Sequence, residues 1–200
     1  MIALCLDISY TNIGWCVVES SLNAGVAVVK AAGVIQTKKN KNEVSGTKDC
    51  VDRCYTIFRE MALPMSLYTL DCVIVESMSW PRNASSATKM ALAWGAVGSW
   101  IGALPVITAA PQSIKLDLTG SRSADKSEVE AAVRSRLSDL SISLLEASVP
   151  KASLREHCWD ALGAFFSAKK RGNLPYRPKV SLPARPVPPA APKKAKRRSP

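Results

Sequence analysis

The feature that most constrains this chain is a series of short apolar runs, each about as long as a β-strand. Three runs follow one another in the first 37 residues, at 1–9, 13–20 and 25–37, and two more lie at 70–77 and 104–110. Only three residues join the first two runs, which predicts a hairpin. The run at 70–77 is apolar at nearly every position until it ends in a carboxylate, which is typical of a strand buried on both faces. The run at 104–110 is predicted to be another short buried strand.

Between and after these runs, apolar residues recur at helical spacing. The predicted helices cover 49–62, 84–103, 125–137 and 153–170. Asp125 and Glu128 form a candidate capping pair, and Ser153 and Glu156 form a candidate capping box for the last helix. The helix at 84–103 is rich in alanine and glycine, which predicts close packing against a neighbour. Three strands, a helix, and then alternating strands and helices indicate an α/β domain with a mixed sheet.

The positive charge is concentrated at the C-terminal end of the chain. The formal net charge is +11, but residues 169–200 hold eleven basic residues and no acidic ones, so residues 1–168 have a net charge of zero. Residues 171–200 are also rich in proline and poor in large apolar side chains, which predicts disorder. We therefore expect a domain at 1–170 followed by a disordered basic tail at 171–200. The tail could add sequence-independent affinity for DNA, which we favour, act as a localisation signal, or increase solubility.

Cysteine usage and hydropathy both indicate an intracellular protein. The six cysteines form no C-x-x-C pair, and Cys5, Cys16 and Cys72 lie in apolar runs, where reduced cysteine behaves as a small hydrophobic residue. Asp7 interrupts the N-terminal apolar run, so this run does not match a signal peptide. The apolar stretch 90–110 is broken by three glycines and Pro105, so it does not match a membrane span. We expect a soluble cytoplasmic protein with no membrane partner.

Four side chains are candidates for a metal site. Asp7 lies inside an apolar run and Glu76 ends another, while His157 and Asp160 share one face of a predicted helix. Each has an ordinary structural explanation by itself, such as a strand-end cap or a core histidine. Carboxylates are rarely buried without a partner or a metal. Oxygen ligands suit Mg²⁺, and the imidazole makes Mn²⁺ plausible as well.

Four stretches in chain order resemble the motifs of the RuvC family of Holliday-junction resolvases, which have an RNase H-like fold. They are "LDISYTNIGWCVVE", "VIVESMSWPRNASSATKMALAWGAV", "ITAAPQSIKLDLTGSRSADKSEV" and "HCWDALGAFF". The resemblance covers roughly residues 1–168 and implies a mixed five-stranded sheet flanked by helices. The chain departs from the family pattern twice. Asp7-Ile8-Ser9 replaces D-P-G, and His157 takes the first position of the closing acidic pair.

The resemblance implies a metal-dependent endonuclease that cuts four-way junctions or other branched DNA by paired symmetric nicks, leaving 5′-phosphate and 3′-hydroxyl ends. Asp7, Glu76 and Asp160 would then hold two Mg²⁺ ions. His157 would be a fourth ligand, or a base that orients the attacking water. The resemblance also implies a homodimer, with the small-residue helix at 84–103 as its dimer surface.

Basic and aromatic residues near these motifs are candidates for DNA binding. Lys115 and Lys126 match the two basic positions of the family's third motif, and Arg82 and Lys89 are weaker candidates. All four could instead be solvated surface charges. Trp80 could stack on an unpaired base at the junction centre, or it could anchor its loop on the core.

Two other functions stay open at this point. A DNA-binding protein with the same fold but impaired catalysis is consistent with His157 and with the missing D-P-G. Sugar kinases and actin-like ATPases also open with a strand that bears an aspartate and a turn that contains threonine, but this chain has no second phosphate loop and is much shorter.

Overall fold

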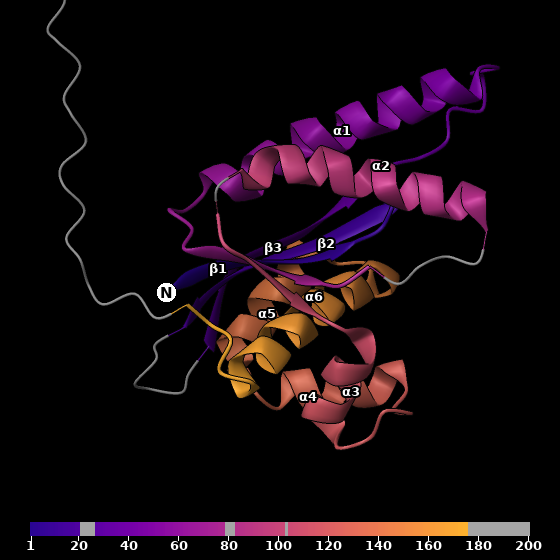
Figure 1. The fold of residues 1–200 in the computed structure, drawn as a ribbon. Coiled ribbons are helices and arrows are strands. Elements are labelled where there is room, and N and C mark those ends of the chain that lie inside the picture. The colour runs from indigo at the N-terminus through magenta and orange to yellow at the C-terminus, as the bar shows by residue number, and fades with distance from the viewer. Residues whose placement is uncertain (21–26, 79–82, 103, 176–200) are drawn as a thin grey trace, which may run out of the picture.

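A five-stranded mixed sheet forms the centre of the protein (Figure 1). The computed structural model describes residues 1–20, 27–78, 83–102 and 104–175. Within these ranges the strand order is β3-β2-β1-β4-β5. Both β1–β2 and β2–β3 pair antiparallel, whereas β4 joins β1 in parallel and β5 joins β4 in parallel, which confirms the predicted hairpin and mixed sheet. The strands are β1 (Ile2–Ile8), β2 (Asn12–Ser20), β3 (Ala27–Gln36), β4 (Cys72–Glu76) and β5 (Val106–Ala109).

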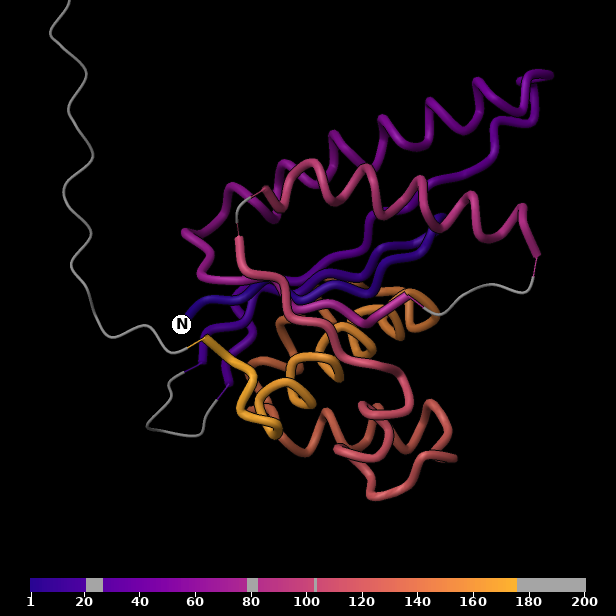
Figure 2. The backbone as a smooth tube through the Cα atoms, viewed as in Figure 1, coloured from indigo at the N-terminus to yellow at the C-terminus, as the bar shows by residue number. Residues whose placement is uncertain are grey.

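Helices cover both faces of the sheet (Figures 1 and 2). One layer contains α1 (Gly46–Ser66) and α2 (Ala84–Ile101). The other contains α3 (Pro111–Thr119), α4 (Lys126–Arg134), α5 (Asp139–Ser148) and α6 (Ala152–Lys170), with α6 lying against the centre of the sheet. The result is a sheet between two helical layers.

The alternation of side chains along β1 divides the core into two parts. Ala3 and Cys5 point to the α6 side, where they belong to the same apolar cluster as Phe165. Leu4 and Leu6 point to the opposite side, where the cluster includes residues of α1 and α2. β4 divides in the same way, which confirms that it is buried on both faces.

One of the two predicted helix caps is correct. Asp125 and Glu128 form a complete capping box at the start of α4, as predicted. The Ser153–Glu156 box is wrong, because α6 already begins at Ala152 and its N-cap, Lys151, makes no side-chain cap bond. Glu156 is therefore one turn inside the helix, and its carboxylate pairs with Lys126 instead.

The predicted helices and strands also differ from the structure at their limits. β5 is an edge strand and Val106 is 46% exposed, so the prediction of a buried strand is wrong for most of its length. α1 is longer than predicted at both ends. Ser45 caps it at an earlier start, and the helix continues past Pro64 to Ser66. Two helices, α3 and α5, were not predicted at all.

No helix in the described parts of the chain is long and apolar enough to cross a membrane. The segment from residue 176 onward lies outside the described residues. The division into a domain at 1–170 and a tail at 171–200 therefore stays a prediction.

Candidate active site

The ends of two neighbouring strands carry the first two candidate residues. β1 and β4 are parallel neighbours, with Leu6 opposite Val75, so Asp7 and Glu76 come next in the same register. Cys5 and Ile74, two residues earlier on each strand, both point to the α6 side. Because side chains alternate along a strand, Asp7 and Glu76 point to that side as well.

α6 crosses this end of the sheet at very short range. Gly14 of β2 lies opposite Asp7, and a Cβ placed on Gly14 would overlap the backbone carbonyl group of His157. Only glycine permits this approach. The approach brings Nδ1 of His157 to 2.8 Å from Oδ2 of Asp7, which accepts the hydrogen bond. Sequence reasoning did not single out Gly14, although a glycine inside a strand is a known signal of close backbone contact.

The turn after Asp7 is closed without the D-P-G sequence. The Ser9 hydroxyl donates to the Asn12 carbonyl oxygen at 2.6 Å and accepts from the Asn12 amide at 3.1 Å, and the Ser9 amide donates to the same carbonyl at 3.2 Å. A serine side chain can take the place of a backbone turn in this way. The Asp7-Ile8-Ser9 departure therefore still gives a tight β1–β2 turn.

A small cavity brings two of the carboxylates and two of the predicted DNA-binding lysines together. Its volume is about 140 Å³. Glu76 comes from the end of β4 and Asp160 from α6, while the lysines come from α3 and the start of α4. The cavity is lined by Glu76, Pro111, Ile114, Lys115, Lys126, Val129 and Asp160.

Lys126 forms ion pairs at the edge of this cavity. Its Nζ lies 3.6 Å from Oδ2 of Asp160 and 3.3 Å from Oε2 of Glu156. Glu156 was not among the predicted site residues. Its position one helical turn before Asp160, on the same face of α6, was the signal that could have identified it.

The carboxylates of this site are only partly neutralised by the neighbouring lysines, and the pKa values of Glu76 and Asp160 are raised. Burial, and then the nearby Asp7 and Asp160, raise the pKa of Glu76 to about 7 despite the opposing effect of the two lysines. Burial and Asp7 also raise the pKa of Asp160. The hydrogen bond with Asp7 raises the pKa of His157 above its usual value. Crowded carboxylates of this kind either keep a proton or bind a cation.

Of the three other predicted DNA-binding residues, only Lys89 is among the described residues, and it does not lie at the cavity. Lys89 is exposed on α2, which belongs to the layer on the other face of the sheet. Trp80 and Arg82 lie outside the described residues, so their roles stay predictions.

Comparison with known proteins identifies the family of this chain. The family described as crossover junction endodeoxyribonuclease RuvC matches residues 3–148. The chain belongs to the RuvC family. A RuvC crossover junction endodeoxyribonuclease from Methylococcus capsulatus is 31% identical over 144 residues, which are 71% of this chain and 76% of that protein.

Solved structures of resolvases share the fold. RuvC of Thermus thermophilus, solved in complex with a Holliday junction substrate, is similar with a TM-score of 0.67 and 26% identity, and the match covers 86% of this chain and 94% of that one. The yeast mitochondrial Holliday junction resolvase is similar with a TM-score of 0.52 and 10% identity over 85% of this chain and 82% of that one. The predicted RNase H-like sheet of the RuvC family is confirmed. Membership of the RuvC family therefore favours the resolvase interpretation over the sugar-kinase and actin-like ATPase interpretation.

Proposed function

We propose that this RuvC-family protein resolves four-way DNA junctions by paired symmetric nicks that leave 5′-phosphate and 3′-hydroxyl ends. One observation carries the proposal. Glu76 and Asp160 line one small cavity with Lys115 and Lys126, next to the Asp7–His157 pair. Acidic and basic side chains thus meet where a phosphodiester could be held and hydrolysed. The Thermus thermophilus RuvC solved with a Holliday junction substrate supports the choice of substrate.

We further propose that Asp7, Glu76, His157 and Asp160 hold two Mg²⁺ ions, with Mn²⁺ as the alternative. The donor set of three carboxylates and one imidazole fits these metals. The raised pKa of Glu76 supports a cation at this place, because positive charge would let the carboxylates ionise together. No group of three or more histidine, cysteine, aspartate and glutamate side chains in the described ranges already has metal-binding spacing. The proposal therefore requires these side chains to change their positions when metal binds.

The side chains of this chain would have distinct roles in the reaction. When bound, the two ions would supply activation of a water molecule and stabilisation of the departing 3′-oxygen. Asp7 and Glu76 sit on strands packed on both faces, which fixes their carboxylates relative to each other. His157 would hold a proton next to Asp7 or bind metal. Lys115 and Lys126 would contact the phosphate without reading the base sequence.

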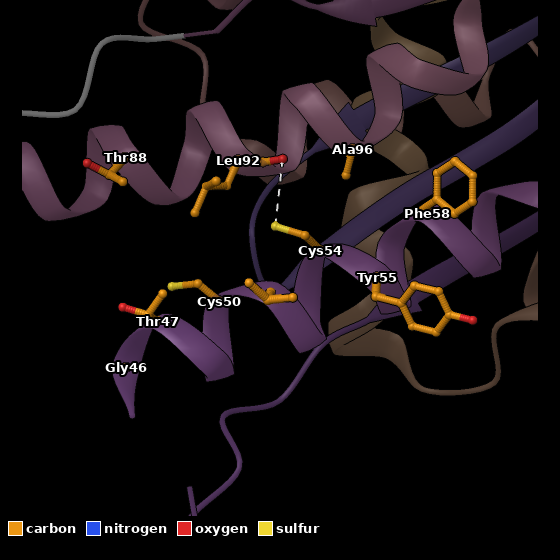
Figure 3. Close-up of a pocket in the computed structure, with 10 residues that line it drawn as sticks. Gly46, Thr47, Cys50, Cys54, Tyr55, Phe58, Thr88, Leu92 and Ala96 are labelled. Carbon is orange, nitrogen blue, oxygen red and sulfur yellow. Dashed lines mark hydrogen bonds between the residues drawn. The ribbon is translucent and has the colours of Figure 1, made fainter. Parts of the chain in front are cut away.

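A homodimer would give the two-fold symmetry that two symmetric cuts require. The structure offers an apolar surface for it, a groove of about 690 Å³ between α1 and α2 (Figure 3). Val51 and Tyr55 of α1 are 61% and 63% exposed beside it. α2 packs on α1 and the sheet through Ala93 and Val97, as the sequence predicts, whereas an added Cβ on Gly95 or Gly98 would meet no heavy atom of the described residues within 4 Å. We propose that a second copy of the chain covers this surface.

Incubation with a labelled four-way junction and Mg²⁺ tests the proposal. We expect symmetric nicks on two opposing strands, with ends that a DNA ligase can reseal. A gel shift without nicks would support the alternative of a junction-binding protein with impaired catalysis, and would contradict the proposed chemistry.

The role of His157 is tested by His157→Asp, which restores the acidic pair of the family motif. If His157 binds metal, we expect cleavage to persist while the ratio of Mg²⁺-supported to Mn²⁺-supported rates changes. An unchanged ratio with unchanged cleavage would show that His157 is not a ligand. Asp139→Asn, on an exposed carboxylate of α5, is the control and should change neither rate.

A further inference from the structure

We infer that residues 37–45, which we call the lysine loop, form a second DNA-contact element that binds the phosphate backbone of a junction arm beside the cut site. The loop connects β3 to α1 and carries Lys38, Lys39 and Lys41. This inference rests on the proposed function, because it extends the DNA surface of the same site.

The lysine loop lies at the same end of the sheet as the candidate active site. β1 ends there, one residue after Asp7, and β3, which is antiparallel to β2, ends there as well, with Gln36 opposite Asn12. The Thr37 amide donates to the carbonyl oxygen of Thr11 in the β1–β2 turn at 2.9 Å. In Figure 1 the connection from β3 to α1 lies on the right, as do the first turns of α2 and α6. β3 is two strand spacings from β1, roughly 10 Å, which is about the rise of three base pairs.

A buried polar network fixes the start of this loop to the catalytic turn. Arg53 of α1 is only 8% exposed, and its Nε donates to the Thr37 hydroxyl at 2.9 Å. Its Nη2 donates to the Tyr10 carbonyl oxygen at 3.2 Å, and its guanidinium lies 3.9 Å from the centre of the Tyr10 ring. The Thr37 hydroxyl itself donates to the same Tyr10 carbonyl. One buried arginine therefore ties β3, α1 and the β1–β2 turn together.

The same network fixes the middle of the loop. Asp49, 7% exposed, lies 3.8 Å from Arg53, and its Oδ1 accepts a hydrogen bond from the Asn40 amide at 2.9 Å. Removing two charges from water costs several kcal/mol per ion unless hydrogen bonds replace the lost hydration. The hydrogen bonds of Asp49 and Arg53 offset part of this cost, and they connect the loop to the turn after Asp7. A rigidly held surface loop is the usual carrier of binding residues.

The lysines of the loop are available for an external partner. Lys38, Lys39 and Lys41 are exposed, and within the described ranges no carboxylate lies within ion-pair distance of any of them. Lys48, at the start of α1, instead pairs with Glu43 and Asp52. The three loop charges are therefore presented together, unneutralised, at the catalytic end. Three such charges suit a polyanionic partner. DNA bound at the adjacent cavity would be this partner, because its backbone would pass the lysine loop.

The test uses junction binding by the full chain with Asp7→Asn added throughout, so that the DNA is not cut. The triple variant Lys38→Gln/Lys39→Gln/Lys41→Gln is compared with a control that loses the same charge elsewhere, Lys30→Gln/Arg59→Gln/Lys169→Gln. Lys30 and Arg59 are paired with Glu19 and Glu60. Fluorescence anisotropy between 50 and 200 mM salt gives the affinity and its salt dependence.

We expect the loop variant to bind at least about tenfold more weakly than the control at low salt, and its slope of log affinity against log salt to be smaller in magnitude by about 2 to 3. Equal affinities and slopes for the loop variant and the control would overturn the inference. Nicking by the chain that retains Asp7 is measured separately. If that chain binds through the loop but makes no nicks, the proposed chemistry fails and the loop's role in binding stands.

Discussion

The two faces of the sheet present very different surfaces at their helical layers. On one face, α6 lies so close to β2 that only glycine fits between them, and it brings His157 and Asp160 to the carboxylates at the strand ends. On the other face, α1 and α2 leave an apolar groove with Val51, Tyr55 and Phe58 exposed beside it (Figure 3).

Under the proposed function, this difference separates the face that carries the chemistry from the face that carries the dimer contact. Charged groups gain most from fixed positions, because small displacements change their electrostatic energies strongly at short range. Apolar surface gains free energy from any partner that removes it from water. The α6 face is therefore the place where single substitutions should change the reaction. The α1–α2 face is the place where they should change the oligomeric state.

The largest effect is expected for Asp7→Asn on the α6 face. If Asp7 holds metal as proposed, its loss removes several kcal/mol of transition-state stabilisation, so cleavage of a four-way junction should fall about 10³-fold or more, while junction binding persists. The measurement is single-turnover cleavage alongside anisotropy binding. Cleavage at the normal rate would remove Asp7 from the proposed site.

On the opposite face, Val51→Glu/Tyr55→Glu should dissociate the proposed dimer. Both side chains are more than half exposed, so the fold should persist, but two carboxylates in an apolar interface cost several kcal/mol. Light scattering should then give the mass of one chain, and junctions should receive single instead of paired nicks. A monomeric parent chain would contradict the assignment of the groove.

Gly14→Ala tests the close approach of α6. The added Cβ would overlap His157, so we expect the free energy of unfolding to fall by about 1–3 kcal/mol and cleavage to weaken with it. Gly46→Ala at the start of α1, where an added Cβ meets nothing within 4 Å, is the matched control. It should change stability by no more than about 0.5 kcal/mol. Equal urea midpoints for the two variants would contradict the proposed packing.

The last effect, which is confined to higher pH, is a gain in stability for Glu76→Gln. The pKa of Glu76 is about 7 in the folded chain and near its usual 4.5 when unfolded, so the folded state holds the proton more tightly. Stability due to this group is therefore greatest below pH 4.5 and is lost as pH rises to about 7. Without metal, the variant should be more stable than the parent at pH 8, by on the order of 1–3 kcal/mol, and similar to it at pH 5. The same difference at both values would contradict the burial of charge at this site.

Local sequence patterns predicted most of the fold correctly. The apolar runs identified all five strands, since a buried strand requires apolar side chains whatever its neighbours are. α3 and α5 were missed because each is short and has few buried residues, so its apolar period is weak. The Ser153–Glu156 box failed because the pattern is compatible with several helix starts, and the packing of α6 selects an earlier one.

Candidate site residues could be named from the sequence because a carboxylate in an apolar run is unusual. Its burial costs free energy unless a partner or a metal compensates. The arrangement of these residues could not be derived in this way. Glu156 and Lys126 are 30 residues apart in the sequence, and they form an ion pair only because α4 and α6 pack against each other. Gly14 was overlooked because its importance depends on a helix that begins well over a hundred residues later.

By itself, the sequence determined which strands form, that Asp7 lies within one of them and Glu76 ends another, and that His157 and Asp160 share a helix face. These properties are local, since they follow from backbone geometry and from the period of the side chains. Only the tertiary structure decided that β4 lies beside β1, that α6 crosses Gly14, and that Arg53 ties the lysine loop to the turn after Asp7. Those contacts join distant segments, and they form only when burial of the whole core offsets the entropy of bringing the segments together.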